Sequence, residues 1–309
     1  MRPFQRLPFA ALPARPARPH PFFDLAPQDL VLDDSPFAGT PIRYRVTGDG
    51  PPLLLVHGLM TSGYSWRWVL APLARHHRVW VPDLPGAGDS GKPDRRYDAP
   101  ALAAAIGAFQ RQAGIRGCAC VGNSLGGYLC MRLALADPGA FSRLVNVHSP
   151  ALPEPRLHAL HAALAVPGVR AALAWWVRRD PLRWAHANVH YHDETLKSLE
   201  EARTYGAPLA DPAGTRAFTA WLGEALAPRD LAAFCAALAA LRARGAPFPV
   251  PLLLVYARQD PMVPPRIGHA LHALVPGARL VWLEDSSHFA HVDSPERVVA
   301  LVEEFFGAP

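Results

Sequence analysis

Residues 118–136 read CACVGNSLGGYLCMRLALA, an apolar run followed by a glycine-rich turn and a second apolar run. The first run predicts a strand over residues 119–121, and the second predicts a helix over residues 125–136. The turn between them matches the pattern G-x-S-x-G, centred on Ser124, which exposes a nucleophilic serine when it joins a strand to a helix. Glycines on both sides let the strand and helix approach, and the helix N-terminus favours negative charge developing at the serine. We therefore predict that Ser124 is a catalytic nucleophile.

Strand and helix patterns alternate on both sides of this turn. Alternating or continuous apolar residues predict further strands at residues 42–46, 53–56, 79–81, 144–147, 252–256 and 280–283. Apolar residues at helical spacing predict helices at residues 64–75, 101–113 and 295–306. Such alternation is typical of an α/β fold in which right-handed crossovers connect a mostly parallel sheet flanked by helices.

Two segments depart from the alternation. Residues 151–245 are rich in Ala, Leu, Arg and Trp, and prolines divide them into short helices. We expect them to form a helical cap inserted between two strands of one core, which would comprise residues 37–150 and 246–309. Residues 1–36 contain eight prolines and little periodicity. They predict an extended arm, either loosely ordered or lying along the core or a partner subunit.

Composition narrows the class of protein. The chain has 309 residues and a net charge of +5, and four arginines precede its first acidic residue, Asp24. The remainder is close to neutral, so nucleic-acid binding is not indicated.

No apolar run is long enough to span a membrane, and no clear signal-peptide cleavage site follows the N-terminus. We expect a monomer or homodimer.

Four cysteines, at positions 118, 120, 130 and 235, lie in apolar runs without metal-binding spacing. Buried free thiols fit a reducing compartment, so we expect a cytoplasmic protein that needs no metal or cofactor.

A serine hydroxyl needs a base and an orienting carboxylate to act as a nucleophile. Asp260 follows the expected strand at residues 252–256, and His288 follows the last expected strand. The carboxyl ends of parallel strands are where such sheets place their sites. We therefore predict a Ser-Asp-His triad with Asp260 as the acid and His288 as the base. Glu284 and Asp285 are weaker candidates for the acid because they are too close in sequence to His288, and His291 is a weaker candidate for the base.

Two backbone N–H groups are needed to bind the oxyanion formed during acyl transfer. Leu125, directly after Ser124, supplies one. The loop after the strand at residues 53–56 supplies the other, with Leu59 as the first candidate and Met60 as the second. We interpret His57, at the start of this loop, as a residue that orders the loop and not as a second base.

These motifs resemble those of the α/β-hydrolase fold superfamily, in the branch that carries a helical cap. The matching stretches are His57-Gly58, DLPGAGDS at residues 83–90, the turn around Ser124, DPMVP at residues 260–264 and His288. The resemblance assigns the same triad, Ser124, Asp260 and His288, and the same oxyanion donors, Leu59 and Leu125. The form Asn-Ser-Leu-Gly-Gly is similar to that of bacterial capped esterases and of meta-cleavage C–C hydrolases.

Differences from the motifs of related hydrolases narrow the set of reactions that we expect this chain to catalyse. Haloalkane dehalogenases and epoxide hydrolases carry an aspartate at the place of Ser124, so their chemistry is disfavoured. The C–C hydrolases carry a glycine-rich stretch where this chain has LMTS at residues 59–62. We therefore expect a hydrolase that cleaves carboxylic esters of hydrophobic, uncharged small molecules. The alternatives are a C–C bond hydrolase that uses the same triad and a non-catalytic ligand-binding member of the fold.

The insertion also contains histidines and tryptophans that resemble site residues. His186, His190, His192 and Asp193 could be drawn as a metal site, but we expect solvated or capping side chains. Trp175, Trp176, Trp184 and Trp221 could either line an acyl pocket or pack the cap on the core.

Overall fold

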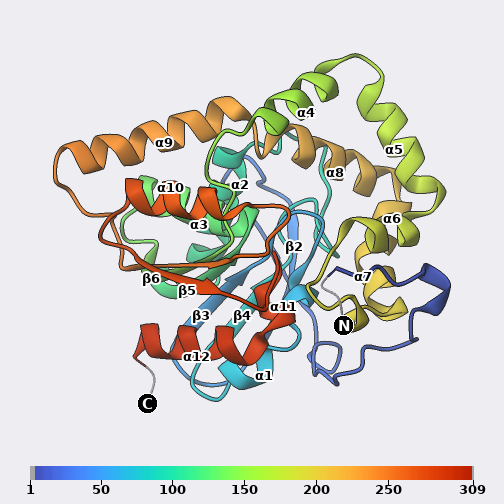
Figure 1. Cartoon of the computed structure of the whole chain (residues 1–309), viewed down its shortest axis with the longest axis horizontal. Helices are drawn as coiled ribbons and strands as arrows, with labels where there is room; N and C mark the ends of the chain where they lie inside the picture. Colours follow the sequence, from blue (N-terminus) through green and yellow to red (C-terminus); the bar gives the residue numbers. More distant parts are fainter. Residues whose placement is uncertain (1–3, 308–309) are drawn as a thin grey trace.

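The computed structural model describes residues 4–307 and is built around an eight-stranded sheet (Figure 1). The strand order is β1-β2-β4-β3-β5-β6-β7-β8. Strand β2 pairs antiparallel with β1 and β4, and all other pairs are parallel. The strands are β1 (Gln28–Val31), β2 (Pro41–Thr47), β3 (Pro52–Val56), β4 (Arg78–Pro82), β5 (Cys118–Asn123), β6 (Phe141–Val147), β7 (Leu252–Ala257) and β8 (Arg279–Leu283). The mostly parallel α/β architecture predicted from the sequence is confirmed.

Both faces of the sheet are covered, which explains the continuous apolar runs of its central strands. Successive side chains of a strand point to opposite faces, so Leu54 and Val56 of β3 join one hydrophobic cluster and Leu53 and Leu55 join the other. The first cluster includes α2 (Ala99–Gln112), α3 (Leu125–Ala136) and α10 (Pro265–Leu274). The second includes α1 (Leu70–Leu73), α11 (Ala290–Asp293) and α12 (Pro295–Phe306).

The segment between β6 and β7 is helical, as expected. It runs along the upper and right-hand parts of the molecule in Figure 1. Its helices are α4 (Pro155–Ala165), α5 (Val169–Arg179), α6 (Pro181–Asn188), the 3₁₀ turn η3 (Glu194–Leu196), α7 (Leu199–Ala210), α8 (Pro212–Glu224) and α9 (Pro228–Ala243). Val177, Leu209 and Phe218 give this insertion a small hydrophobic cluster of its own.

A buried ion pair fixes the insertion to the core. Arg67 donates to Glu201 Oε2 of α7 at 2.7 Å, and the Tyr191 hydroxyl donates to the same oxygen at 2.7 Å. Both charged side chains are almost fully buried. The Arg67 guanidinium lies over the rings of Tyr64 and Trp68, at 4.5 and 4.2 Å from their centroids. A buried ion pair linking elements so far apart in sequence ties their positions together.

Of the arrangements expected for the N-terminal segment, the structure shows the one in which it lies along the core. After the 3₁₀ turn η1 (Phe9–Ala11), it packs against the insertion and the core and then enters the sheet as the edge strand β1. The Leu199 N–H donates to the carbonyl of Pro13, and the Trp68 indole donates to the carbonyl of Arg18. Phe22 is buried against Tyr64. The backbone carbonyls of Pro13 and Arg18, together with the buried ring of Phe22, therefore give this segment contacts along the core and the insertion.

Residues 64–75, which we expected to form one helix, instead form two shorter elements. The structure has a 3₁₀ turn, η2 (Gly63–Trp66), and then the short helix α1. The Ser62 hydroxyl caps the 3₁₀ turn by accepting from the Tyr64 N–H. Pro72 lies inside α1 and lacks the N–H that a longer helix would need at that position. The bounds of the remaining predicted strands and helices lie within three residues of the observed ones, the largest difference being at the start of β6.

Candidate active site

The turn at Ser124 has a strained backbone. Ser124 adopts φ 52° and ψ −121°, a conformation that residues with a side chain rarely adopt. An added Cβ at Gly126 would lie 2.4 Å from the Val56 carbonyl oxygen, and one at Gly122 would lie 2.6 Å from the backbone of α3. Gly58 packs beside the Ser124 Cβ, because an added Cβ there would lie 3.0 Å from it. Glycines on three sides therefore allow the tight strand-to-helix turn that presents this serine.

The predicted acid and base meet. His288 Nδ1 lies 2.8 Å from Asp260 Oδ2, and both side chains are buried. The other carboxylate oxygen of Asp260 accepts from the N–H groups of Met262 and Val263 at 2.7 and 2.8 Å. Burial pushes the pKa of Asp260 upward, but His288 and these N–H groups outweigh burial and hold it below its usual value. The carboxylate is therefore charged and positioned to orient the imidazole.

Ser124 and His288 line one cavity of about 320 Å³, together with Leu59 and Met60. Among the residues that the structure describes, no hydrogen bond joins the side chains of Ser124 and His288. Such contacts are commonly long in unliganded enzymes and shorten when substrate binds. The structure thus brings the predicted nucleophile, base and oxyanion loop to a single cavity.

The cavity is mainly apolar. Leu157 and Leu160 of α4 line it from the insertion, and Ile267 of α10 lines it from the core. Two charged residues also reach it, Glu154 and Arg156. Their charged groups have partners, since Glu154 pairs with Arg266 and Arg156 donates to the carbonyl of Met262. An uncharged ligand suits this lining, as is common for small-molecule pockets.

The candidate oxyanion donors are free. Within residues 4–307, the N–H groups of Leu59, Met60 and Leu125 donate to no backbone carbonyl. Leu125 is the first residue of α3, where helix geometry leaves the N–H without a partner. Met60 has a positive φ of 64°, so the loop is sharply bent at this point.

His57 orders this loop, as we predicted. Its Nδ1 donates to the Gly58 carbonyl at 2.8 Å, and its Nε2 accepts from the Leu84 N–H at 3.0 Å. Burial lowers the pKa of His57, so it stays neutral and keeps both bonds. The ring is occupied on both nitrogens and is not available as a base.

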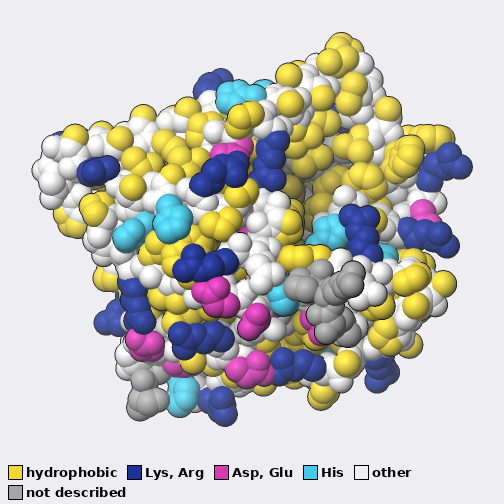
Figure 2. All heavy atoms as spheres, in the orientation of Figure 1, with side chains coloured by type: hydrophobic (Ala, Val, Ile, Leu, Met, Phe, Trp, Pro, Cys, Tyr) yellow, Lys and Arg dark blue, Asp and Glu magenta, His cyan; other side chains and the backbone are white. Residues whose placement is uncertain are grey.

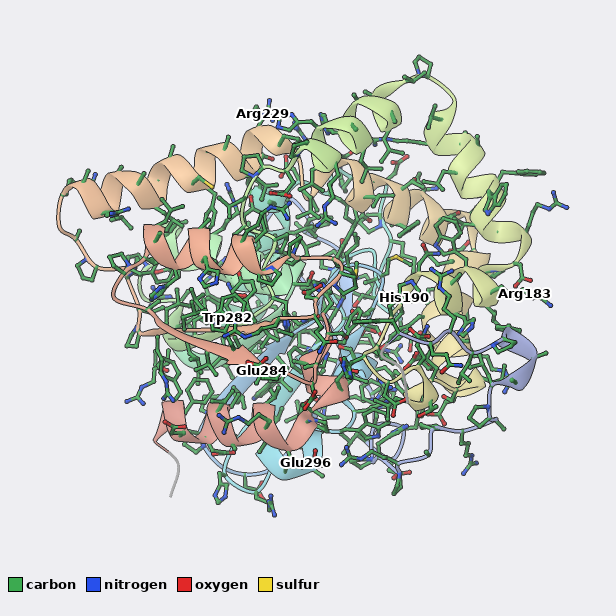
Figure 3. The ribbon with its side chains drawn as sticks, viewed as in Figure 1. Arg183, His190, Arg229, Trp282, Glu284 and Glu296 are labelled. Carbon is green, nitrogen blue, oxygen red and sulfur yellow. The ribbon has the colours of Figure 1, made fainter. Side chains whose placement is uncertain are left out.

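The rival triad residues lie elsewhere. Glu284 is exposed at the end of β8 and pairs with Arg258 at 2.8 Å (Figure 3). Asp285 is also exposed. His291 is fully buried with its ring centroid 4.2 Å from that of Trp66, and burial holds its pKa well below the usual value. None of the three lines the cavity at Ser124.

Two residues near the site were not singled out from the sequence. Asn123 is fully buried, and its Nδ2 donates to the carbonyl oxygen of His288 at 3.0 Å. Asn123 stands inside the G-x-S-x-G turn, and this position could have identified it from the sequence. His148, after β6, accepts from the Ala257 N–H at 2.6 Å, and its ring centroid is 5.8 Å from that of His288. Burial lowers the pKa of His148 to about 3, so no second positive charge forms beside the proposed base.

The histidines of the insertion have separate partners. His186 contacts the Leu7 carbonyl, and His190 contacts Glu194. The His192 N–H donates to Asp293, and Asp193 caps η3. Of the four tryptophans, Trp221 donates to the Pro85 carbonyl, while Trp175 and Trp176 are exposed; none of the four lines the cavity at Ser124.

The model of the α/β-hydrolase fold family matches residues 51–295. The chain belongs to this family. As an α/β hydrolase, it is 30% identical over 268 residues to the pimeloyl-[acyl-carrier protein] methyl ester esterase of Aeromonas hydrophila, covering 84% of this chain and 97% of the relative. It is 27% identical over 275 residues to the 2-hydroxymuconate semialdehyde hydrolase of a Pseudomonas strain, covering 87% and 91%.

The fold of this α/β hydrolase is also similar to that of a thermophilic esterase from Thermogutta terrifontis. The two structures superpose with a TM-score of 0.71 at 23% identity, over 91% of this chain and 98% of the other. At this level of identity the likeness concerns the fold.

Proposed function

We propose that this α/β hydrolase cleaves carboxylic esters through an acyl-enzyme formed on Ser124. The observation that carries the proposal is that one apolar cavity contains Ser124, on its strained turn, and His288, hydrogen-bonded to Asp260. The esterase named among the relatives supports the reaction class.

In this mechanism the Ser124 Oγ bonds to the ester carbonyl carbon, and its proton passes to His288 Nε2. The electron pair moves to the carbonyl oxygen, where the N–H groups of Leu59 and Leu125 bind the developing charge. When the tetrahedral intermediate collapses, the C–O bond breaks and His288 gives its proton to the departing alcohol. A water then attacks the acyl-enzyme by the same steps and releases the acid, with Asp260 stabilising the imidazolium each time.

The cavity supports a hydrophobic, uncharged substrate. Its volume of about 320 Å³ lies at the small end of ligand pockets. Glu154 is paired with Arg266, and Arg156 donates to the neutral carbonyl of Met262, so the preference for an uncharged substrate rests on the mainly apolar lining. We propose that the helical insertion, residues 151–245, acts as the cap of the core at residues 37–150 and 246–309.

Hydrolysis of a C–C bond is the second candidate, because a 2-hydroxymuconate semialdehyde hydrolase is also among the relatives. The same triad would serve, and the leaving group would be a stabilised carbanion in place of an alkoxide.

The test is a panel of short and medium p-nitrophenyl esters assayed beside a vinylogous diketone, with wild type and Ser124→Ala in parallel. We expect ester turnover to exceed diketone turnover and to be lost in Ser124→Ala. Faster turnover of the diketone would favour the C–C hydrolase. No turnover of either substrate, with Ser124 inert to acylating agents, would point to a binding protein.

A further inference from the structure

The outer face of α5, with the bend that joins it to α4, is exposed and largely apolar. Trp175 and Trp176 are 55% and 65% exposed, and Val166, at the bend between the helices, is 53% exposed. They are three of the five large hydrophobic residues that are exposed within residues 4–307. Ala172, Trp175, Trp176 and Arg179 recur at helical spacing and form one exposed stripe along α5. Figure 2 shows hydrophobic side chains gathered at the upper right, over these two helices.

The charge of this face is one-sided. Residues 154–183 contain five arginines and two acidic residues, Glu154 and Asp180, so their net charge is positive. Arg170 is paired with Glu224, but Arg179 has no carboxylate partner among the residues that the structure describes and lies over the Trp175 ring at 4.9 Å. Arg183, at the outer edge of the insertion where α5 meets α6 (Figure 3), pairs with Asp180 at 3.1 Å. Arg178 donates to the Thr215 hydroxyl, so Arg179 is the basic side chain that borders the apolar face of α5 without a bonded partner among residues 4–307.

The same helices form part of the candidate active site. Leu157 and Leu160 of α4 line the cavity that contains Ser124. A surface hollow of about 480 Å³ beside α5 is lined by Trp176, and its wall includes Asn188, which also lines the cavity at Ser124. A ligand held at the outer face would therefore lie next to the candidate active site.

We propose that α4 and α5 dock this protein on the surface of a bilayer that contains anionic phospholipids. Trp175 and Trp176 would sit at the headgroup level, where tryptophan side chains concentrate, and the arginines beside them would face lipid phosphates. The helices meet at 97°, so they lie along the surface and do not cross the bilayer as one straight span.

Charge favours this occupant over a second copy of the chain. Two copies joined through this face would bring together two surfaces that each carry five arginines and two acidic residues over residues 154–183. An anionic lipid surface has the complementary charge, and each basic side chain near it contributes about 1 kcal/mol of attraction. Docking would place the cavity where apolar esters dissolve. That consequence rests on the proposed esterase function, whereas docking itself does not.

The test is co-sedimentation of the full chain with vesicles of phosphatidylcholine, with and without phosphatidylglycerol. We expect the wild type to bind the anionic vesicles at least about tenfold more tightly than the neutral ones. The double variant Trp175→Ser/Trp176→Ser should lose at least about tenfold in binding and retain p-nitrophenyl ester turnover, since neither residue lines the cavity. Phe23→Ser is the matched control, because Phe23 is 50% exposed in the N-terminal segment, and it should bind like the wild type.

Two further variants test the docking proposal independently of the folding of the double variant and of the proposed esterase function. Arg179→Glu should weaken binding to anionic vesicles selectively, which tests the proposal even if the double variant does not fold. Ser124→Ala should bind vesicles like the wild type, so a failure of docking is distinguishable from a failure of the proposed function. The proposal is overturned if the wild type does not sediment with anionic vesicles, or if the tryptophan variants bind as well as the wild type. A dimer that dissociates in the tryptophan variant, without vesicle binding, would instead identify the face as a contact between copies.

Discussion

The side chain of Asn123 links the turn of the proposed nucleophile to the loop of the proposed base, because its Nδ2 donates to the carbonyl oxygen of His288 at 3.0 Å. The same Nδ2 lies 3.3 Å from the carbonyl oxygen of Val147 at the end of β6. One buried amide therefore fixes the positions of the His288 loop, the Ser124 turn and the end of β6 relative to one another.

We predict that Asn123→Ala lowers kcat for ester hydrolysis by about 10- to 100-fold with little change in KM. The cause is a base that is no longer fixed relative to Ser124, and small misplacements of catalytic groups are costly. Asn123→Asp should not restore activity, since its carboxylate would face two carbonyl oxygens. Steady-state kinetics on one p-nitrophenyl ester measures the effect.

Asn146→Ala is the control for this variant. Asn146 is equally buried, on β6, and donates to the sulfur of Met131. Its loss should lower stability while leaving kcat of the folded enzyme close to that of the wild type. Equal losses of kcat in both variants would contradict the positioning role of Asn123.

The buried pair of Arg67 and Glu201 should stabilise the protein as a unit. Arg67→Met leaves the carboxylate of Glu201 buried without its cation, which costs about 3–5 kcal/mol in such sites. Adding Glu201→Gln should recover part of that loss, so the double variant is expected to unfold at a higher denaturant concentration than Arg67→Met alone. Equilibrium unfolding in urea measures all three proteins.

An exposed pair provides the comparison. Arg116 pairs with Asp137 at 2.7 Å with about half of its side chain in solvent. Arg116→Met is expected to change the free energy of unfolding by less than about 1 kcal/mol. Similar losses for Arg67→Met and Arg116→Met would show that the buried pair contributes no more to stability than an exposed one.

Asp293 predicts a specific dependence of stability on pH. Burial raises the pKa of Asp293 to about 6, although its carboxylate accepts from the hydroxyl and N–H of Ser287 and from the N–H of His192. The unfolded chain releases this proton near pH 4. Between those values the folded state holds more proton than the unfolded state, so this group makes stability fall as pH rises from about 4 to about 6.

The predicted loss over that interval is about 2–3 kcal/mol. Asp293→Asn removes the titrating group, so the slope of unfolding free energy against pH should become less negative, whatever the variant's stability at any single pH. Unfolding curves at several pH values between 4 and 6 measure both slopes. Parallel slopes in the two proteins would mean that Asp293 does not titrate in this range.

Local patterns in the sequence were sufficient to predict most of the strands and helices of the core. The continuous apolar runs of β3, β5, β6 and β7 marked strands buried on both faces, and α3 and α12 have the predicted bounds. The triad residues were predicted from the serine motif, from their positions after strands and from the family resemblance, because a serine turn and two loops after strands meet at one edge of a parallel sheet. In the structure Ser124 and His288 line one cavity, and Asp260 contacts His288 from behind.

Contacts between distant segments could not be predicted. Arg67 and Glu201 are 134 residues apart, and neither belongs to a recognisable motif. For the proline-rich N-terminal segment the choice between a loose arm and one lying along the core stayed open, because single-chain patterns do not show which surface a segment without periodicity will cover. Strand β1 is short and mostly exposed, so its residues carry little of the apolar signal by which strands are recognised.

The most direct test of the account asks whether Ser124 is the nucleophile. The wild type and Ser124→Ala are treated with a fluorophosphonate, and each is measured by intact mass spectrometry followed by peptide mapping. We predict a single adduct on the wild type, on the peptide that contains Ser124, and no adduct on Ser124→Ala. An unlabelled wild type, or equal labelling of Ser124→Ala, would contradict the proposed mechanism.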